Sequence, residues 1–546
     1  MLALIVVLNL GTVYMAVLNN EWYARFYDAL QNKDQAVFWR EIVVFCWIAA
    51  GFIAIAIVKF YMTQLLQMHW RAWMTRDYLE RWMADHTFYH LELGRYAVRE
   101  GGVPDNPDQR IQEDMQMFTS YTMTLSMGLL NAVVTLISFV GILWGLSGEA
   151  TFFGVHVPGS MVWIAVIYCA VGTTMTHFIG RPLIGLNFQQ QRLEADFRHH
   201  LVRVREYSEA IALDRGEKVE HAQLGTRFGA VLGNYLALIR KQKNLVAFTA
   251  SFGQASVIFA FIVQAPRFFS GAIQLGQLMQ VNSAFSRVQD SLSWFVDNYD
   301  TVAVWRATAD RLTSFDEAMR NHAAARDTIT REPADALTTE GLTVALPNGG
   351  VLLQDLALSV TPGASVLLKG PSGSGKSSLF RAIAGIWPFA RGKVRVPADA
   401  MFIPQRPYFP DGTLRDALAY PRPATDYSDD ALKQALDDAL LPQLKDHLDE
   451  RSAWGQKLSG GEQQRLAIAR VLLKKPKWIF ADEATSALDA PAEQTLYARL
   501  VAQAAQAQGA LISIAHRPAV AAFHTTSWEL EKEAEDAGAM YRLRQA

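Results

Sequence analysis

Long runs of apolar residues dominate the first 300 positions of the chain, whereas apolar and polar residues alternate over shorter distances in the rest. Five of these runs lie at residues 2–18, 42–62, 121–146, 161–179 and 246–269. A helix needs about 20 mainly apolar residues to cross roughly 30 Å of hydrocarbon. The pattern therefore predicts membrane-spanning helices in the first part of the chain and a water-soluble domain in the second. The first run is short, as though a preceding portion of it were missing.

A sixth span is predicted at residues 273–296, although this segment carries several polar side chains, namely Gln277, Gln280, Asn282, Arg287 and Asp290. Such side chains are tolerated in a membrane only where they face protein or a water-filled cavity. Arg287 and Asp290 are three residues apart and share a helix face. They either line a polar cavity that contacts a transported solute or form an ion pair where the helix leaves the membrane. The ion pair is favoured, because Arg287 lies near one end of the span.

Composition limits the classes of protein that fit. At 546 residues the chain is too long for one hydrophobic core, so two or more domains are expected. A net charge of −2 gives no reason to expect a nucleic-acid partner. The two cysteines, Cys46 and Cys169, lie inside apolar runs, which does not support a disulfide framework or a zinc site. The first residues lack a basic region and a cleavage pattern, so a removed signal peptide is not expected.

The loops between the spans differ in charge. Residues 64–120 and 181–243 form long, arginine-rich segments, whereas residues 147–159 contain no lysine or arginine. The positive-inside rule places the long segments in the cytoplasm. Within them, residues 106–114 and 194–217 are either solvated helix faces or contacts that pass motion between the soluble domain and the spans.

The domain boundaries follow from composition. Residues 321–337 are rich in alanine, arginine and aspartate without an apolar period, which predicts a linker. Residues 341–360 predict paired strands around a turn at 347–350. The predicted organisation is a transmembrane domain of six helices at 1–320, the linker at 321–337 and an α/β nucleotide-binding domain at 338–546.

A glycine-rich stretch follows an apolar strand and precedes an apolar helix. Its residues are Gly370, Pro371, Ser372, Gly373, Ser374, Gly375, Lys376, Ser377 and Ser378. The glycines allow backbone N–H groups to turn toward phosphate oxygens, while Lys376 reaches the β and γ phosphates and the Ser377 hydroxyl binds Mg²⁺. This stretch predicts a nucleotide phosphate site.

A second anion-binding helix start is predicted where Ser459, Gly460 and Gly461 open an apolar helix. One phosphate group needs only one such site. Two in one domain are explained if the Ser459–Gly461 loop of one copy closes on the phosphates held by Lys376 of another. The sequence therefore predicts a dimer.

Three further elements supply candidate catalytic groups. Asp482 and Glu483 end an apolar strand, where Asp482 holds Mg²⁺ and Glu483 orients or deprotonates the attacking water. Gln405 follows another strand and reaches Mg²⁺ or that water. Residues 486–489 follow as a contact across the dimer, which adds Asp489 to the nucleotide-binding set. His516 ends a buried strand and bridges the γ phosphate and Glu483.

This ordered set resembles the nucleotide-binding domain of ABC transporters from residue 341 onward. The resemblance implies Mg-ATP held between two such domains and hydrolysis coupled to switching of the spans between inward-open and outward-open states. Spans and one ATPase domain in a single chain resemble a half-transporter, which works as a homodimer. The family usually carries an aromatic residue that stacks on adenine, but residues 344–347 contain none.

A narrower resemblance concerns the cargo. Residues 379–388, 403–408 and 515–518 are similar to subfamily D, the fatty-acyl-CoA transporters and their YddA-like relatives. Residues 106–114, 197–217 and 276–295 are similar to SbmA/BacA-like proteins, which take up peptides and other hydrophilic solutes. The prediction is an ATP-driven transporter of a peptide or hydrophilic solute in a bacterial inner membrane, with lipid and solute as its other partners. An acyl-CoA transporter, or a nucleotide-gated channel or regulatory membrane ATPase, are the alternatives.

Overall fold

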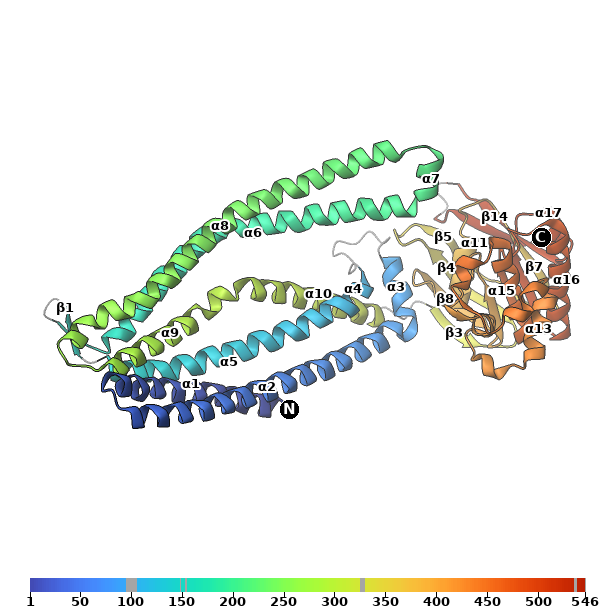
Figure 1. Cartoon of the computed structure of the whole chain (residues 1–546). Coiled ribbons are helices and arrows are strands. Elements are labelled where there is room, and N and C mark those ends of the chain that lie inside the picture. Colours follow the sequence, from blue (N-terminus) through green and yellow to red (C-terminus); the bar gives the residue numbers. More distant parts are fainter. Residues whose placement is uncertain (95–105, 148, 153–154, 325–328, 535–537, 546) are drawn as a thin grey trace. The chain divides into compact units, whose positions relative to one another are not determined.

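The computed structural model describes the chain except residues 95–105, 148, 153–154, 325–328, 535–537 and 546 (Figure 1). The described residues form two compact units. One contains Met1–Arg76 and Asp108–Leu312, and the other contains Asp77–Pro107 and Thr313–Ala546. Each unit is described by itself below.

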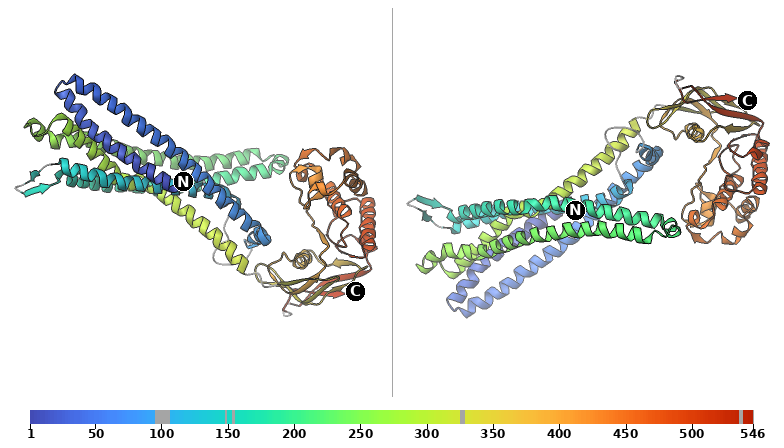
Figure 2. Two further views of the ribbon diagram at one scale, coloured as in Figure 1. Left: turned by 90° about the horizontal axis from the view of Figure 1, so that it is seen from below. Right: turned by 90° about the horizontal axis from the view of Figure 1, so that it is seen from above.

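The first unit is built from long helices. These are α1 (Leu2–Gln31), α2 (Gln35–Met83), α5 (Met115–Leu146), α6 (Ser160–Glu206), α8 (Glu217–Phe269), α9 (Leu275–Asp297) and α10 (Tyr299–Ala324). The last turns of α2, after Arg76, and of α10, after Leu312, belong to the second unit. Shorter elements are α4 (Pro107–Gln109), the π-helical turn η2 (Arg110–Asp114), α7 (Ser208–Leu213) and the hairpin of β1 (Glu149–Phe152) and β2 (Val155–Pro158). Helices α6 and α8 lie side by side and are joined by α7, as the two views of Figure 2 show.

Five of the predicted spans are confirmed as helices long and apolar enough to cross a membrane. They are α1, α2, the helical segment that ends at Leu146, α6 and α8. The sixth predicted span forms α9, which is not among these five because of its polar residues, so the count of six spans is not confirmed. The apolar face of α9 packs with α5, α6 and α8 in one buried core that includes Phe139, Met161, Ala260 and Phe285.

The start of α9 is fastened to α1. The Gln31 side-chain oxygen accepts a hydrogen bond from the Leu275 N–H at 2.7 Å, and Asp28 accepts one from the Gly276 N–H at 2.7 Å. These acceptors satisfy N–H groups that have no partner within their own helix. A Cβ atom on Gly276 would lie 2.0 Å from the Ala24 carbonyl oxygen, so the close approach requires glycine here.

The second unit contains two main sheets. The strand order in the larger sheet is β15-β14-β7-β13-β12-β9, and in the smaller one β3-β8-β4-β5. The larger sheet comprises β7 (Ser365–Lys369), β9 (Ala400–Ile403), β12 (Trp478–Asp482), β13 (Ala510–Ile514), β14 (Thr526–Lys532) and β15 (Tyr541–Gln545). The smaller comprises β3 (Ile329–Pro333), β4 (Leu337–Ala345), β5 (Val351–Leu356) and β8 (Ala390–Val396), with β6 (Ser359–Val360) paired to β4. The predicted strand pair around residues 347–350 is present as β4 and β5.

Helices cover the larger sheet and form a separate helical subdomain. They are α11 (Lys376–Ala384), α12 (Leu414–Ala419), α13 (Asp429–Asp438), α14 (Trp454–Lys457), α15 (Gly460–Lys474), α16 (Ala490–Gln506) and α17 (Pro518–Ala521). Short elements complete this part, namely η3 (Ala424–Asp426), η4 (Pro442–His447), β10 (Gly412–Thr413) and β11 (Arg451–Ser452). Strands β7, β13, β12 and β9 are parallel, so their carboxyl ends meet at one edge.

The structure divides the chain differently from the expected linker at residues 321–337. Residues up to Ala324 continue α10, and residues 329–333 form β3, which pairs with β8. Glu332 forms ion pairs with Lys393 and Arg395 on β8, so charges that look typical of a linker serve instead as cross-strand partners.

The second unit also includes α3 (Thr87–Gly94), preceded by the short helix η1 (Ala84–His86), from the long loop after α2. His90 Nε2 lies 3.0 Å from the Ile386 carbonyl oxygen, and Leu93 packs against the core that the two main sheets share. Neither contact was predicted from the sequence. Two loop stretches, residues 106–114 and 194–217, are candidates in the sequence for contacts that pass on motion. Residues 106–114 contain α4 and η2, and residues 194–217 contain the end of α6, all of α7 and the start of α8.

Candidate functional site

The glycine-rich stretch forms a loop between β7 and the start of α11. Gly373 and Gly375 have φ values of +79° and +90°, which strain residues with a side chain. A Cβ on Gly375 would also lie 2.9 Å from Leu352 Cδ1. The loop therefore leads directly into the positive N-terminal end of a helix, as a phosphate site requires.

Lys376 lies at the start of α11 and is only 6% exposed. Its Nζ donates hydrogen bonds to the Gly370 and Pro371 carbonyl oxygens at 2.9 and 2.8 Å. Burial lowers the pKa of Lys376, while the nearby Glu483 and Asp482 carboxylates oppose this shift. A buried ammonium without a direct ion pair among the described residues is suited to bind an anionic phosphate.

Ser374 adds a second sign that the loop fits a phosphate. Its side chain is completely buried, and its hydroxyl has no hydrogen-bond partner among the described residues. Buried polar groups are nearly always hydrogen-bonded in native proteins. The orphaned hydroxyl is therefore consistent with a ligand that completes the loop.

Asp482 and Ser377 provide oxygen ligands of the kind that Mg²⁺ prefers. Burial raises the pKa of Asp482, a hydrogen bond from Ser377 lowers it, and the Glu483 carboxylate raises it further. Both residues line a cavity of about 310 Å³ together with Phe380, Arg381, Gln405 and Arg406. Among the described residues no group of three or more His, Cys, Asp or Glu side chains is placed to hold a metal ion.

The three predicted catalytic residues come together around one carboxylate. Gln405 Nε2 donates a hydrogen bond to Glu483 Oε2 at 2.7 Å, and His516 Nε2 lies 3.2 Å from Glu483 Oε1. The three residues follow β9, β12 and β13, which are adjacent parallel strands. The Glu483 side chain remains 24% exposed, so water has access to it.

The second predicted anion site forms the start of α15. Ser459 caps this helix by a capping box, in which its hydroxyl accepts from the Glu462 N–H and Glu462 accepts from the Ser459 N–H. The Ser459 hydroxyl and N–H lower the pKa of Glu462. In the described part of the chain no hydrogen bond joins Ser459 to the phosphate loop, so the two halves of the predicted ATP site do not meet through Ser459 within one copy.

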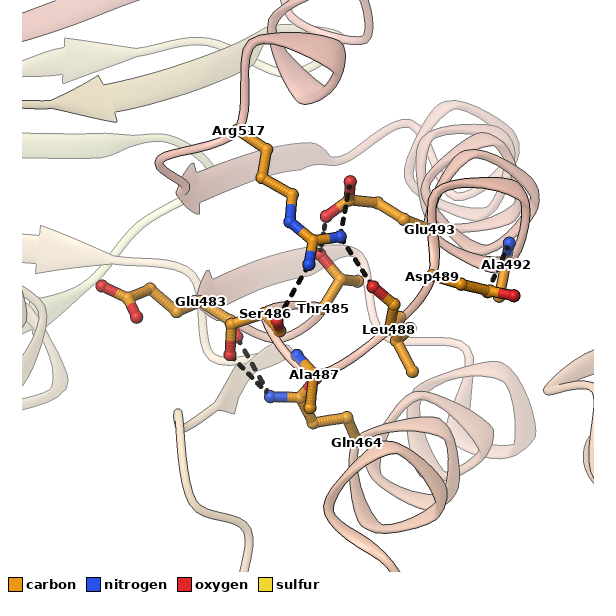
Figure 3. A network of polar contacts seen from close by, with 10 residues as sticks. All are labelled: Gln464, Glu483, Thr485, Ser486, Ala487, Leu488, Asp489, Ala492, Glu493 and Arg517. Carbon is orange, nitrogen blue, oxygen red and sulfur yellow. Dashed lines mark hydrogen bonds and ion pairs between the residues drawn. The ribbon is translucent and has the colours of Figure 1, made fainter.

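The loop from Ala484 to Asp489 is held from two sides (Figure 3). On one side Gln464 donates to the Ser486 hydroxyl at 2.9 Å and accepts from the Ala487 N–H at 2.8 Å. On the other side Arg517 donates to the Leu488 carbonyl at 2.7 Å. Asp489 accepts from the Ala492 N–H and caps α16.

Sequence reasoning missed Gln464, Glu493 and Arg517. The available signals were their places in the chain, because Gln464 follows the Ser459–Gly461 cap, Glu493 lies in the first turn of α16 after Asp489, and Arg517 follows His516 directly. None of these positions has a chemical signature of its own, and only the tertiary contacts assign them to the site.

Comparison with known proteins gives matches to both halves of the chain. Residues 1–269 match the family model described as "ABC transporter transmembrane region 2", and residues 353–486 match the one described as "ABC transporter". The inner membrane ABC transporter ATP-binding protein YddA of Escherichia coli is 33% identical over 529 residues, which cover 95% of this chain and 92% of that protein.

Two further similarities extend over most of the chain. The chloroplastic ABC transporter D family member 2 of Arabidopsis thaliana is 33% identical over 610 residues, covering 96% of this chain and 82% of that protein. A solved structure of a bacterial Atm1-family ABC exporter with ATP bound shares the fold with a TM-score of 0.75 at 20% identity, covering 99% of this chain and 93% of the other.

Proposed function

Because this chain belongs to the ABC transporter family and combines its membrane region and its ATPase domain, we propose that it moves a hydrophilic solute across a bacterial inner membrane. It is an integral membrane protein that hydrolyses ATP and couples this to transport. The name of the Escherichia coli relative supports the inner membrane as its location. A peptide or another water-soluble compound is the proposed cargo, and uptake is a proposed direction.

The hydrolytic roles are proposed from the site geometry. The loop of residues 370–378 binds the ATP phosphates, and Ser377, Asp482 and Gln405 hold Mg²⁺. The bound Mg²⁺ would supply positive charge that offsets the charge developing on the phosphates. Glu483 orients and deprotonates the attacking water, and the contacts of Gln405 and His516 with both of its oxygens support this role.

A dimer of two copies is proposed to complete each ATP site. Ser459, Gly460 and Gly461 form an anion-binding helix start that is not hydrogen-bonded to the phosphate loop among the described residues of its own chain. A second copy brings this helix start to the phosphates held by Lys376. Asp489 reaches the shared nucleotide in the same way.

The observation that carries the proposed cargo class is a polar stripe along α9. Arg287, Asp290 and Asp297 are exposed on one face of this helix, while Val281, Ala284, Phe285 and Val288 on the opposite face are buried at 2% exposure or less. From Arg287 to Asp297 the stripe runs about 15 Å, roughly half of the hydrocarbon thickness, and α9 with its 23 residues is long enough to cross that thickness.

Charged side chains do not face lipid at that depth. We therefore propose that α9 is the sixth span and that its stripe lines a water-filled path for the solute. Arg287 and Asp290 are both exposed, as a water-filled path requires of the charges that line it.

The alternatives make different use of the same parts. A fatty-acyl-CoA transporter would need an apolar surface for its acyl chain, and the stripe of α9 offers a polar one. A nucleotide-gated channel or regulatory membrane ATPase would not need a catalytic carboxylate such as Glu483. Accumulation of a solute against its gradient would distinguish a transporter from a nucleotide-gated channel and from a regulatory membrane ATPase.

The test is ATP hydrolysis and uptake by the purified protein in lipid vesicles, with a labelled cationic peptide and palmitoyl-CoA as probes. We expect ATP-dependent peptide accumulation, with Glu483→Gln binding ATP but hydrolysing almost none and Lys376→Ala losing nucleotide binding. Retained turnover in Glu483→Gln would remove Glu483 from its role. Accumulation of palmitoyl-CoA instead of the peptide would reassign the cargo.

Substitutions on α9 test the path separately. Arg287→Met with Asp290→Leu should abolish peptide transport and leave basal ATP hydrolysis in place, whereas Arg287→Gln with Asp290→Asn keeps the surface hydrophilic and should retain part of the transport. If the apolar pair transports normally, the stripe does not line the path.

A further inference from the structure

The guanidinium of Arg517 and the carboxylate of Glu493 form an ion pair behind the ATP site. Arg517 Nη1 lies 3.4 Å from Glu493 Oε2, and the Glu493 side chain is only 3% exposed. The other oxygen of Glu493 accepts a hydrogen bond from the Thr485 hydroxyl at 2.7 Å. Both oxygens of this buried carboxylate therefore have a partner. Arg517, which directly precedes α17, contacts one of them, and Thr485, in the loop after Glu483, contacts the other.

Arg517 also holds the loop of residues 484–489 by its backbone. It donates to the Leu488 carbonyl oxygen at 2.7 Å and to the Ser486 carbonyl oxygen at 3.2 Å (Figure 3). A planar guanidinium with several fixed donors suits this combination of one carboxylate and two carbonyls. Arg517 therefore fixes the shape of the loop that starts immediately after Glu483.

The position of Arg517 in the chain connects this loop to His516. The side chain of His516 contacts Glu483, and the neighbouring Arg517 donates hydrogen bonds to the carbonyl oxygens of Ser486 and Leu488. A displacement of the loop therefore pulls on the backbone that carries His516. Glu483 itself has a φ of +49°, so the chain at this point adopts a conformation that needs support from its surroundings.

The opposite side of the loop leads to the second anion site. Gln464 binds Ser486 and Ala487 and belongs to α15, whose first turn is Ser459–Gly461. One loop thus touches the helix proposed to bind the partner's nucleotide and the strand end that carries His516.

We propose that Arg517, paired with Glu493, is a positioning residue that transmits the state of the loop at residues 484–489 to His516 and Glu483. The inference rests on the proposed ATP-hydrolysing dimer. In that dimer this loop and the Ser459–Gly461 helix start lie beside the nucleotide of the partner copy, so the pair makes hydrolysis at one site depend on occupancy of the other.

The experiment measures ATP hydrolysis and fluorescent-nucleotide binding by the full-length protein in nanodiscs. Arg517→Gln should lower kcat about 10- to 100-fold, leave KM and the nucleotide Kd within about twofold, and reduce the Hill coefficient for ATP toward one. Arg517→Lys, which keeps the charge, should recover part of kcat. Arg544→Gln is the matched control, because it removes an arginine from an exposed ion pair with Glu531 in the same domain.

Glu493→Gln provides a second test that keeps the volume of the side chain. It should reproduce the loss in kcat, and the double variant with Arg517→Gln should lose little more than either single variant, since the two residues act as a unit. If both single variants hydrolyse ATP at the wild-type rate with an unchanged Hill coefficient, the inference is overturned.

A purely structural role would give a different pattern. It would lower the thermal midpoint and raise the nucleotide Kd together with the loss of kcat, and this result would also overturn the inference. If instead the wild-type protein hydrolyses no more ATP than Glu483→Gln, the proposed function fails and the inference with it.

Discussion

A buried charge cluster at the start of α5 allows a quantitative prediction. Asp114 is 1% exposed and accepts hydrogen bonds from Arg311 at 2.7 and 3.0 Å and from Arg110 at 2.8 Å. It therefore joins the start of α5 to α10. Replacing Asp114 by asparagine keeps the volume of the side chain but removes the negative charge that Arg110 and Arg311 both contact.

The magnitude follows from burial. Removing one partner of a buried ion pair costs about 3–5 kcal/mol, because the remaining charge stays desolvated. The Arg311 side chain is 37% exposed and recovers some hydration, whereas that of Arg110 is only 13% exposed. We therefore expect Asp114→Asn to cost about 3 kcal/mol, which corresponds to a fall of about 5–10 °C in the thermal midpoint of a unit of this size.

The assay is thermal unfolding in detergent, followed by tryptophan fluorescence at one scan rate. Asp310→Asn is the control on α10, because Asp310 is 75% exposed and 4.0 Å from Arg306, and exposed pairs contribute little. If Asp114→Asn and Asp310→Asn lower the midpoint equally, the cluster does not stabilise the helical unit as argued.

Three further predictions concern other parts of the chain. Gly276→Ala should lower the thermal midpoint, because its Cβ would meet the Ala24 carbonyl oxygen at 2.0 Å, whereas Gly229→Ala, with open space around it, should be neutral or slightly stabilising. Burial and the neighbouring charges of Arg470 and Arg422 lower the pKa of Lys474 to about 8, so the unfolded chain binds more protons between pH 8 and 10.5. Lys474→Met should therefore stabilise the folded protein by about 1–2 kcal/mol at pH 7, after allowance for the partial exposure of Lys474. This gain should disappear as the pH rises from 8 to 10.5, which thermal unfolding at pH 7 and at pH 10 would test. His516→Ala should lower ATP turnover by about 100-fold while nucleotide binding persists, and equal losses of both would argue that His516 acts mainly in binding.

Local sequence patterns determined the elements of this protein. The apolar runs predicted five membrane-length helices, because crossing hydrocarbon requires a continuous apolar stretch that the sequence displays directly. The strand, glycine-rich loop and helix around Lys376 were equally readable, since the phosphate site depends on neighbours in the chain. Where polar residues interrupt the pattern, as in α9, hydropathy alone did not establish a span.

Only the tertiary structure decided which separated residues meet. Gln405, Glu483 and His516 come together because β9, β12 and β13 are adjacent parallel strands, a strand order that no local pattern encodes. The tertiary structure also decided that Arg517 hydrogen-bonds the loop after Glu483. It likewise decided that position 276 must be glycine, because the Ala24 carbonyl oxygen of α1 leaves no room for a Cβ atom. It is the packing of distant segments that sets which face of α9 is buried and which remains exposed, because periodicity defines the faces of a helix but not their neighbours.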